Sequence, residues 1–317
     1  MNRRVVLAAI LVAILSTSAY IYFSISREEL EGTAKVSGAW ALYPMMVKWA
    51  EEYQKAHPGA RIDLSAGGAG KGMADVLGGL VDIGMVSRDI YPEEINQGAL
   101  GIAVVKDAVV ATMNKDNPVV DELLTKGMKK QTLVSIWVLG NVTTWGEVIG
   151  RPEVTTRINV YTRSDACGAA ETWAKYLGIR QEGLLGVGVY GDPGLVEAVR
   201  NDPLGVGFNN LNYAYDNATG RPIEGLMVVP IDLDENGQID GHEDFYGTKA
   251  EFVEAVAKGT YPSPPARDLY LVAKGEFKGL AKELMKWILT DGQQYVSQAG
   301  YVQLSAERLA EELEILD

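Results

Sequence analysis

The sequence predicts an α/β protein built from two lobes, and two observations support this prediction. Strand-like runs alternate with helix-like runs after residue 27, a pattern typical of a largely parallel sheet covered by helices. The chain also passes between two such units twice, first at 102–113 and again after the proline-rich stretch 261–265. Two crossings make one lobe discontinuous. We expect lobe 1 at 33–110 and 262–317, and lobe 2 at 111–261.

Hydrophobic periodicity places the elements of lobe 1. The run 45–56 has the spacing of an amphipathic helix, with Trp49 and Tyr53 on one face. Short apolar runs that end at glycine or serine read as strands. In chain order we expect a strand ending at Val36, a helix at 45–56, a strand at 61–64, a helix at 73–80, strands at 82–86 and 102–105, and, after the second crossing, a strand at 268–272 and a helix at 278–289.

The same reasoning places the elements of lobe 2. Its strands are short and rich in Val, Ile, Phe and Tyr, and the runs between them have helical spacing. In chain order we expect a strand at 109–113, a helix at 133–138, a strand at 158–161, a helix at 169–177 and strands at 205–208 and 226–231.

Composition limits the classes of function. The 317 residues carry a net charge of −13, and because residues 1–27 hold three arginines and no acid, the remainder carries −16. This acidity argues against nucleic acid as a partner. The single cysteine, Cys167, excludes an internal disulfide and a multi-cysteine metal site. The chain has only two histidines, which argues against a zinc cluster and against a Ser-His-Asp catalytic triad.

The amino terminus reads as a targeting segment. Arg3 and Arg4 precede an uncharged run at 5–23, which has nearly the length needed to cross a bilayer. Basic residues stay on the cytoplasmic side, so the rest of the chain is expected outside the cytoplasm, at the cell surface or in the periplasm. Residues 1–27 are either a cleaved signal peptide, with a small-residue site at 17–19, or an uncleaved membrane anchor.

Three separated glycine-containing turns suggest an anion site. They are SGAWALYP (37–44), GGAGKG (67–72) and TRSDACGA (162–169). Each follows a strand-like run and opens a helix-like run, so each can present helix N-terminal amides and the positive end of a helix dipole to an anion. The second turn is not a P-loop, because Lys71 is followed by glycine rather than by serine or threonine. Each turn could instead be a purely structural connection.

With these turns and three further motifs, the chain resembles the solute-binding proteins of phosphate-uptake ABC transporters. The further motifs are VDIGMVSR (81–88), IWVLGNVTTW (136–145) and the pair DGQQY (291–295) and AGYVQL (299–304). The resemblance covers residues 35–304 and rests on the order and spacing of the motifs together. It implies the two-lobed type II periplasmic-binding-protein fold, a phosphate ligand held between the lobes, and delivery to a membrane permease.

Carried over position by position, the resemblance implies a set of ligand-binding residues. That family commonly has hydroxyl or polar side chains where this chain has Trp40, Ala69, Cys167 and Ala169, so the donors that remain are Arg163, the Ser87-Arg88 pair and backbone amides. Some members place an aspartate where Ser87 stands, which accepts a hydrogen bond from a protonated phosphate oxygen, and Asp165 could take over that role. A helix start beside Arg163 is expected to favour the Cys167 thiolate. The predicted site comprises Ala39, Trp40, Ala41, Ala69, Gly70, Ser87, Arg88, Arg163, Cys167, Gly168 and Ala169.

A second site is predicted by the segment DLDENGQIDGHE (232–243), which fits the calcium-loop pattern D-x-[DN]-x-[DN]-G-x5-E at every defined position. Gly237 permits the sharp bend that this loop requires. The alternative is an acidic, solvated turn. We expect a structural Ca²⁺ in an EF-hand-like loop in lobe 2. Its ligands would be Asp232, Asp234, Asn236, Gln238 through its carbonyl, Asp240 and Glu243.

The sequence therefore predicts a non-enzymatic, monomeric solute-binding protein that captures a tetrahedral oxyanion, with phosphate first, and passes it to an ABC transporter permease. Molybdate, tungstate and sulfate are the alternative anions. Two other classes remain open at this point. A phosphate-cleaving enzyme would need a nucleophile, a base or a catalytic metal beside the turns. A calcium-dependent, anchored surface or adhesion protein would use the calcium loop and leave the turns structural.

Overall fold

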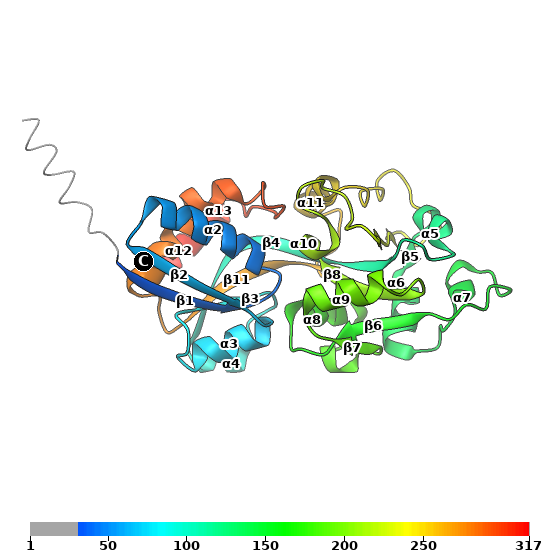
Figure 1. Cartoon of the computed structure of the whole chain (residues 1–317), viewed down its shortest axis with the longest axis horizontal. Helices are drawn as coiled ribbons and strands as arrows, with labels where there is room; N and C mark the ends of the chain where they lie inside the picture. The colour runs from blue at the N-terminus through cyan, green and yellow to red at the C-terminus, as the bar shows by residue number, and fades with distance from the viewer. Residues whose placement is uncertain (1–30, 317) are drawn as a thin grey trace, which may run out of the picture.

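A single long strand, β4 (Ala99–Asn114), runs through both halves of the computed structural model, which describes residues 31–316 (Figure 1). Its 16 residues span about 50 Å at the usual rise of an extended chain. The first part of β4 pairs antiparallel with β11 (Ala266–Lys274), and the last part pairs with β8 (Gly205–Asn210) and β9 (Leu226–Val228). The described chain therefore forms one sheet across both lobes, in the order β2-β1-β3-β11-β4-β8-β6-β7 with β9 beside β4.

In lobe 1, the strands β1 (Gly32–Gly38), β2 (Ala60–Ala66) and β3 (Ile83–Val86) are parallel, and helices lie on both sides of the sheet (Figure 1). Every residue of β3 is buried, as expected for a strand that lies between two others and is covered by helices on both faces. The amphipathic helix predicted around Trp49 is α2, which begins with a proline in its first turn. The helices are α2 (Tyr43–Ala56), α3 (Ala69–Leu77), α4 (Pro92–Asn96), α12 (Gly279–Leu289), the 3₁₀ turn η3 (Asp291–Tyr295) and α13 (Ala306–Leu316).

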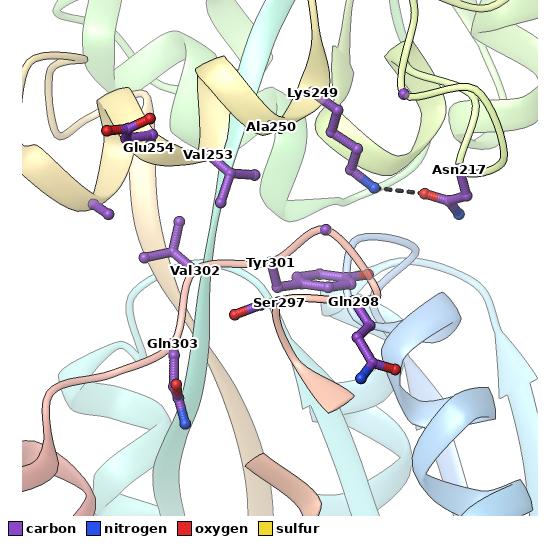
Figure 2. Close-up of a pocket in the computed structure, with 13 residues that line it drawn as sticks. Asn217, Lys249, Ala250, Val253, Glu254, Ser297, Gln298, Tyr301, Val302 and Gln303 are labelled. Atoms are coloured by element: carbon purple, nitrogen blue, oxygen red, sulfur yellow. Dashed lines mark hydrogen bonds between the residues drawn. The ribbon is translucent and has the colours of Figure 1, made fainter. Parts of the chain in front are cut away.

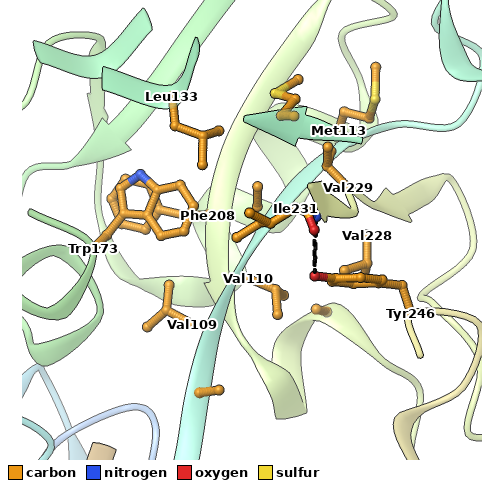
Figure 3. Packing of buried hydrophobic residues seen from close by; sticks show 14 of the residues in the cluster. Val109, Val110, Met113, Leu133, Trp173, Phe208, Val228, Val229, Ile231 and Tyr246 are labelled. Carbon is orange, nitrogen blue, oxygen red and sulfur yellow. Dashed lines mark hydrogen bonds between the residues drawn. The ribbon is translucent and has the colours of Figure 1, made fainter. Parts of the chain in front are cut away.

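In lobe 2, the strands β6 (Asn159–Arg163) and β7 (Val187–Val189) continue the sheet beside β8. A separate two-stranded sheet pairs β5 (Met128–Lys129) with β10 (Ile231–Asp232). Figure 3 shows the core of this lobe, where Trp173 stacks on Phe208 with ring centroids 5.7 Å apart. The helical segments are α5 (Val120–Lys126), α6 (Lys130–Val134), η1 (Ser135–Leu139), α7 (Trp145–Ile149), α8 (Gly168–Leu177), η2 (Gln181–Gly183), α9 (Gly191–Arg200), α10 (Leu211–Ala214) and α11 (Lys249–Lys258).

Several elements differ from their predicted bounds for local reasons. The two strands predicted at 102–105 and 109–113 are parts of the one strand β4. The strand predicted at 226–231 is broken at 229–230, which includes Pro230, and its halves belong to different sheets. Helix α3 begins four residues earlier than predicted, because Gly68 with φ 94° forms its N-cap inside the glycine-rich turn.

The hydrophobic cores divide the described chain at the crossing strands. The core of lobe 1 extends to Val105 and resumes at Leu269, whereas the core of lobe 2 begins at Ala108 and includes Ala266. The lobe 2 core also includes Val302. The lobe boundaries at 110/111 and 261/262 stay predictions. No helix within residues 31–316 has the length and apolar character needed to cross a membrane. The signal or anchor predicted at 1–27 lies outside the described residues.

Candidate anion-binding site

The three predicted turns meet where the two lobes touch. The amides of Gly67 and Gly68 donate hydrogen bonds to the carbonyl of Gly38, at 2.9 and 3.0 Å, so the first two turns are joined within lobe 1. Across the cleft, the amide of Gly70 donates to the carbonyl of Ala166 at 3.0 Å. A Cβ atom on Gly168 would overlap Ser87, so only glycine permits this approach. The described conformation is therefore closed.

Backbone donors remain at the edges of this contact. Helices α3 and α8 begin in the second and third turns, and the amides of Ala69, Gly168 and Ala169 stand in their first turns. Within residues 31–316, none of these three amides has a hydrogen-bond acceptor, and neither has the amide of Ala41. Helix starts with unpaired amides on both sides of a cleft are suited to bind an anion. The amides of two other predicted residues, Ala39 and Gly70, are used within the protein.

Arg163 is the central cation of the site, and its side chain is fully buried. Its Nε and Nη2 donate to the two carboxylate oxygens of Asp165, at 2.8 and 2.6 Å, and its Nη1 donates to Asp192 at 2.6 Å. Burial lowers the pKa of Arg163, but the two carboxylates outweigh burial and raise it, so the guanidinium stays charged. A guanidinium has five N–H groups, so two of them remain for a ligand.

Asp192 is not predictable from the sequence, because nothing in its neighbourhood marks it as a partner of Arg163. Asp192 is fully buried at the start of α9. Besides the bond from Arg163, it accepts hydrogen bonds from the amide of Asn210 at 3.1 Å and from the Asn210 side chain at 2.9 Å. With Asp165 and Asp192 both bound to one guanidinium, the immediate surroundings of Arg163 carry one excess negative charge.

Cys167, a predicted site residue, is buried as a thiol at the start of α8. It is the N-cap of α8, and its Sγ accepts a hydrogen bond from the amide of Ala170 at 3.5 Å. Burial raises the pKa of the Cys167 thiol to about 12, and the opposing effect of Arg163 is smaller. The expectation that the helix start and Arg163 favour a thiolate is therefore wrong, because desolvation dominates.

Trp40 connects the lobes through aromatic contacts. Its ring lies 6.4 Å from that of Tyr190 and 6.5 Å from that of Tyr213, measured between centroids, and both tyrosines belong to lobe 2. A Cβ on Gly191 would lie 3.3 Å from the indole. The Nε1 atom of Trp40 is buried and has no hydrogen-bond partner among the described residues. Trp40 thus takes part in closure and retains an unused donor.

Arg88 is paired within lobe 1. Its two Nη atoms donate to the carboxylate of Glu94 at 2.9 and 2.7 Å, and the guanidinium lies over the ring of Tyr91 at 4.1 Å. Arg88 lines a polar cavity of about 260 Å³ between the lobes, together with Lys175 and Arg267. All the hydrogen bonds of its guanidinium are made within lobe 1.

The predicted calcium loop has the sharp bend that the motif implies. Gly237 has φ 92°. The carboxylate of Asp232 accepts the amides of Asn236 and Gly237, at 3.1 and 2.8 Å. The buried Glu243 accepts the amides of Leu233 and Asp234, at 2.6 and 3.1 Å. Ligand atoms of Asp234, His242 and Glu243 lie within 4.8 Å of one another. The donor set is rich in oxygen, which suits Ca²⁺.

A larger cavity, of about 520 Å³, lies away from the turns, between α11 and residues 297–303 (Figure 2). Figure 2 shows Lys249 at one side of this cavity, pointing toward Asn217, to which its Nζ donates at 2.6 Å. Nζ also donates to Asn212 at 2.6 Å and to the carbonyl of Ala299 at 3.2 Å. Burial lowers the pKa of Lys249 to about 8. No residue of the three turns lines this cavity.

Comparison with known families assigns the fold. The family model described as "PBP superfamily domain" matches residues 26–292. The chain belongs to this superfamily. Its relatives include the phosphate-binding protein PstS of Bacillus subtilis (strain 168), which is 27% identical over 278 residues that cover 87% of this chain and 82% of the relative. The phosphate-binding protein PstS of Methanocaldococcus jannaschii is 26% identical and covers 88% and 85% of the two chains.

Solved structures agree on the fold. A putative phosphate ABC transporter substrate-binding protein with bound phosphate, from Clostridium perfringens, has a TM-score of 0.70 at 21% identity and covers 86% of this chain and 100% of its own. An ABC-type phosphate transport receptor from Vibrio cholerae has a TM-score of 0.61 at 18% identity, with coverage of 86% and 100%. The two-lobed α/β fold predicted from the sequence, and its likeness to periplasmic binding proteins, are confirmed.

Proposed function

We propose that this protein is an extracytoplasmic receptor that captures a tetrahedral oxyanion between its lobes, with phosphate first, and delivers it to an ABC importer. One observation carries the proposal: two helix starts with unpaired amides face each other across the closed cleft, beside a buried arginine with N–H groups to spare. The names of the relatives are those of phosphate-binding proteins. They agree with a binding protein rather than an enzyme.

Ligand capture proceeds by closure of the lobes. The amides of Ala41 and Ala69 come from lobe 1, whereas Arg163 and the amides of Gly168 and Ala169 come from lobe 2. An anion that accepts hydrogen bonds from both sets has higher affinity for the closed form than for the open form, and it therefore shifts the equilibrium toward closure. The protein contacts across the cleft, such as Gly70 to Ala166, add to this stabilisation.

The choice of anion depends on hydrogen bonds more than on charge. Among the predicted site residues, Ser87 supplies a hydroxyl and Arg163 a positive charge, and two aspartates already outweigh that charge. A carboxylate next to the ligand can accept a hydrogen bond from a protonated oxygen, so Asp165 favours an anion that carries a proton at neutral pH. Phosphate does so, whereas sulfate does not. This makes phosphate the first candidate, ahead of sulfate, molybdate and tungstate.

A thermal-shift panel tests the proposal. A ligand that binds only the native state stabilises it by about 2.7 kcal/mol at one hundred times its Kd. Millimolar phosphate should therefore raise the Tm of the purified protein by several degrees, and sulfate should raise it less at the same ionic strength. Equal Tm values in phosphate, sulfate, molybdate, tungstate and chloride would refute oxyanion capture.

The second proposal concerns the loop 232–243. It binds a structural Ca²⁺ through Asp232, Asp234, Asn236, the carbonyl of Gln238, Asp240 and Glu243. The bend at Gly237 and the grouping of oxygens around the buried Glu243 favour it. Chelator should lower the Tm, and Glu243→Gln should abolish that effect, while the control Glu235→Gln in the same loop keeps it. A Tm that is equal in chelator and in calcium would exclude the ion.

The remaining parts of the proposal are the cellular ones. Residues 1–27 direct the chain out of the cytoplasm, either as a cleaved signal or as a retained anchor, and the receptor acts as a monomer beside its permease. Protease treatment of intact cells and the mass of the mature protein separate the two fates of the segment. A mature protein that begins at residue 1 and remains inaccessible to protease would contradict export.

A further inference from the structure

A chain of buried polar contacts connects the strands that cross between the lobes to Arg163. It begins at Arg267, on β11, and passes through Asn210 and Asp192. Arg163, Asp192 and Asn210 are buried, and the side chain of Arg267 is 8% exposed. Buried charged groups of this kind persist only where they are paired, and removing one partner is costly. The arrangement therefore calls for an explanation.

Arg267 contacts both lobes and the strand between them. Its Nε donates to the carbonyl of Ser87, in lobe 1, at 3.2 Å. Its Nη2 donates to the side-chain oxygen of Asn210, in lobe 2. Its Nη1 lies 3.5 Å from the carboxylate of Asp107, which is its cross-strand neighbour on β4, and makes no hydrogen bond to the described residues. A rigid planar guanidinium thus fixes the spacing between one residue of each lobe.

Asn210 links Arg267 to Asp192 through hydrogen bonds. With its oxygen held by Arg267, its side-chain NH₂ is directed to Asp192 Oδ2, at 2.9 Å, and its own amide donates to Asp192 Oδ1 at 3.1 Å. Asp192 Oδ2 is the same atom that accepts Arg163 Nη1. Because an amide side chain could otherwise flip, the bond from Arg267 selects the orientation in which Asn210 donates to Asp192.

We propose that Arg267 is a positioning residue for anion capture, which fixes Ser87 directly and fixes Arg163 through Asn210 and Asp192. The inference rests on the proposed function, since it assigns Arg163 to the ligand. When the lobes open about the crossing strands, Ser87 and Asn210 separate and one guanidinium no longer serves both. The orientation of Arg163 is then completed only on closure, which links the ligand-binding geometry to the closed state.

The test variant does not leave the carboxylate of Asp107 buried alone. Removing Arg267 alone would do so, and Asp107→Asn/Arg267→Gln therefore removes both members of the pair. The reference is Asp107→Asn, in which Arg267 keeps its hydrogen-bond acceptors on Ser87 and Asn210. Calorimetry with inorganic phosphate should show a Kd at least tenfold weaker in the second protein than in the reference. Asn210→Ala on the reference should weaken binding similarly, and the triple variant should add little more, because both changes cut one path.

A second readout does not need a ligand. The ¹⁵N-detected Nε–H signal of Arg163, assigned by its loss in Arg163→Lys, reports the bond to Asp165. It should be sharp and slow to exchange with water in the wild type and in Asp107→Asn, and broadened when Arg267 is also replaced. Arg151→Gln, which removes an exposed guanidinium paired with Glu122 and Glu153, is the control and should leave it unchanged.

The outcomes separate the two claims. An unchanged Arg163 signal after replacement of Arg267, or fully additive losses of affinity in the triple variant, would overturn the relay. If the wild type binds no oxyanion but the Arg163 signal still depends on Arg267, the relay stands and the proposed receptor function fails.

Discussion

The buried carboxylate of Asp107 makes the pH dependence of stability a test of the electrostatics at the crossing strands. Burial raises the pKa of Asp107 from its ordinary value of 3.8 to about 6, and Arg267 offsets only part of that cost. The carboxylate oxygens have no hydrogen-bond partner among the described residues. The substitution Asp107→Asn keeps the shape of the side chain and removes its titration.

The direction in which stability changes with pH follows from the pKa of Asp107 in the folded and in the unfolded state. Because the folded-state pKa is the higher one, the native state binds the proton more tightly than the unfolded state between about pH 4 and about pH 6. The free energy of unfolding therefore falls as the pH rises through this window. At 1.36 kcal/mol per unit, the shift of Asp107 corresponds to about 3 kcal/mol in total. Of this, about 2 kcal/mol is lost between about pH 4.5 and about pH 7.

Urea unfolding at a series of pH values measures this loss. Other carboxylates titrate too, so the quantity to compare is the difference between the wild type and Asp107→Asn. That difference should change by about 2 kcal/mol across the window, with the wild type losing stability toward neutral pH. Asp63→Asn, at an exposed position, is the control and should follow the wild type. Parallel curves for wild type and Asp107→Asn would refute a raised pKa at this site.

Three further predictions concern the cleft. Trp40→Phe removes the unused indole donor but keeps an aromatic ring against lobe 2. Calorimetry should therefore show weaker binding of phosphate, and the Tm of the ligand-free protein should not change. A lower Tm with unchanged affinity would mean that Trp40 only packs. Cys167→Ser places a hydroxyl, which is a better N-cap acceptor, at the start of α8. It should increase the free energy of unfolding by about 1 kcal/mol, seen as a higher Tm, and it should tighten phosphate binding. A loss of affinity in the serine variant would show that the thiol is specifically required. Gly168→Ala would bring a methyl group against Ser87 and should hold the lobes apart, increasing the radius of gyration in solution scattering and weakening phosphate; an unchanged radius and affinity would show that the described closure is not needed for binding.

The sequence predicted what depends on local patterns. Hydrophobic periodicity located α2 and α12, and the glycines of the three turns marked the ends of strands that meet at the cleft. These features are readable because each is encoded within about ten neighbouring residues. The continuity of β4 could not be predicted from the sequence, because one strand that passes from lobe to lobe has the same alternation of residues as two separate strands.

The partners of the site residues were beyond the reach of sequence reasoning. Arg163 was identified from its place before a helix, but its second carboxylate, Asp192, is supplied from 29 residues away. Arg267 gave no signal at all, because an arginine in a strand usually faces solvent, and only pairing with Asp107 across the crossing strands allows its burial. Arg88 stays a predicted site residue, and its partner Glu94, on α4, was not predicted from the sequence.

Isothermal titration of the purified protein with inorganic phosphate, in parallel with Arg163→Lys and the surface control Arg151→Lys, tests the central claim most directly. Lysine keeps the charge against Asp165 and Asp192 but loses the guanidinium fork. The account predicts one phosphate per chain for the wild type and the control, and at least tenfold weaker binding for Arg163→Lys. Absence of binding to the wild type, or equal affinities of all three proteins, would contradict it.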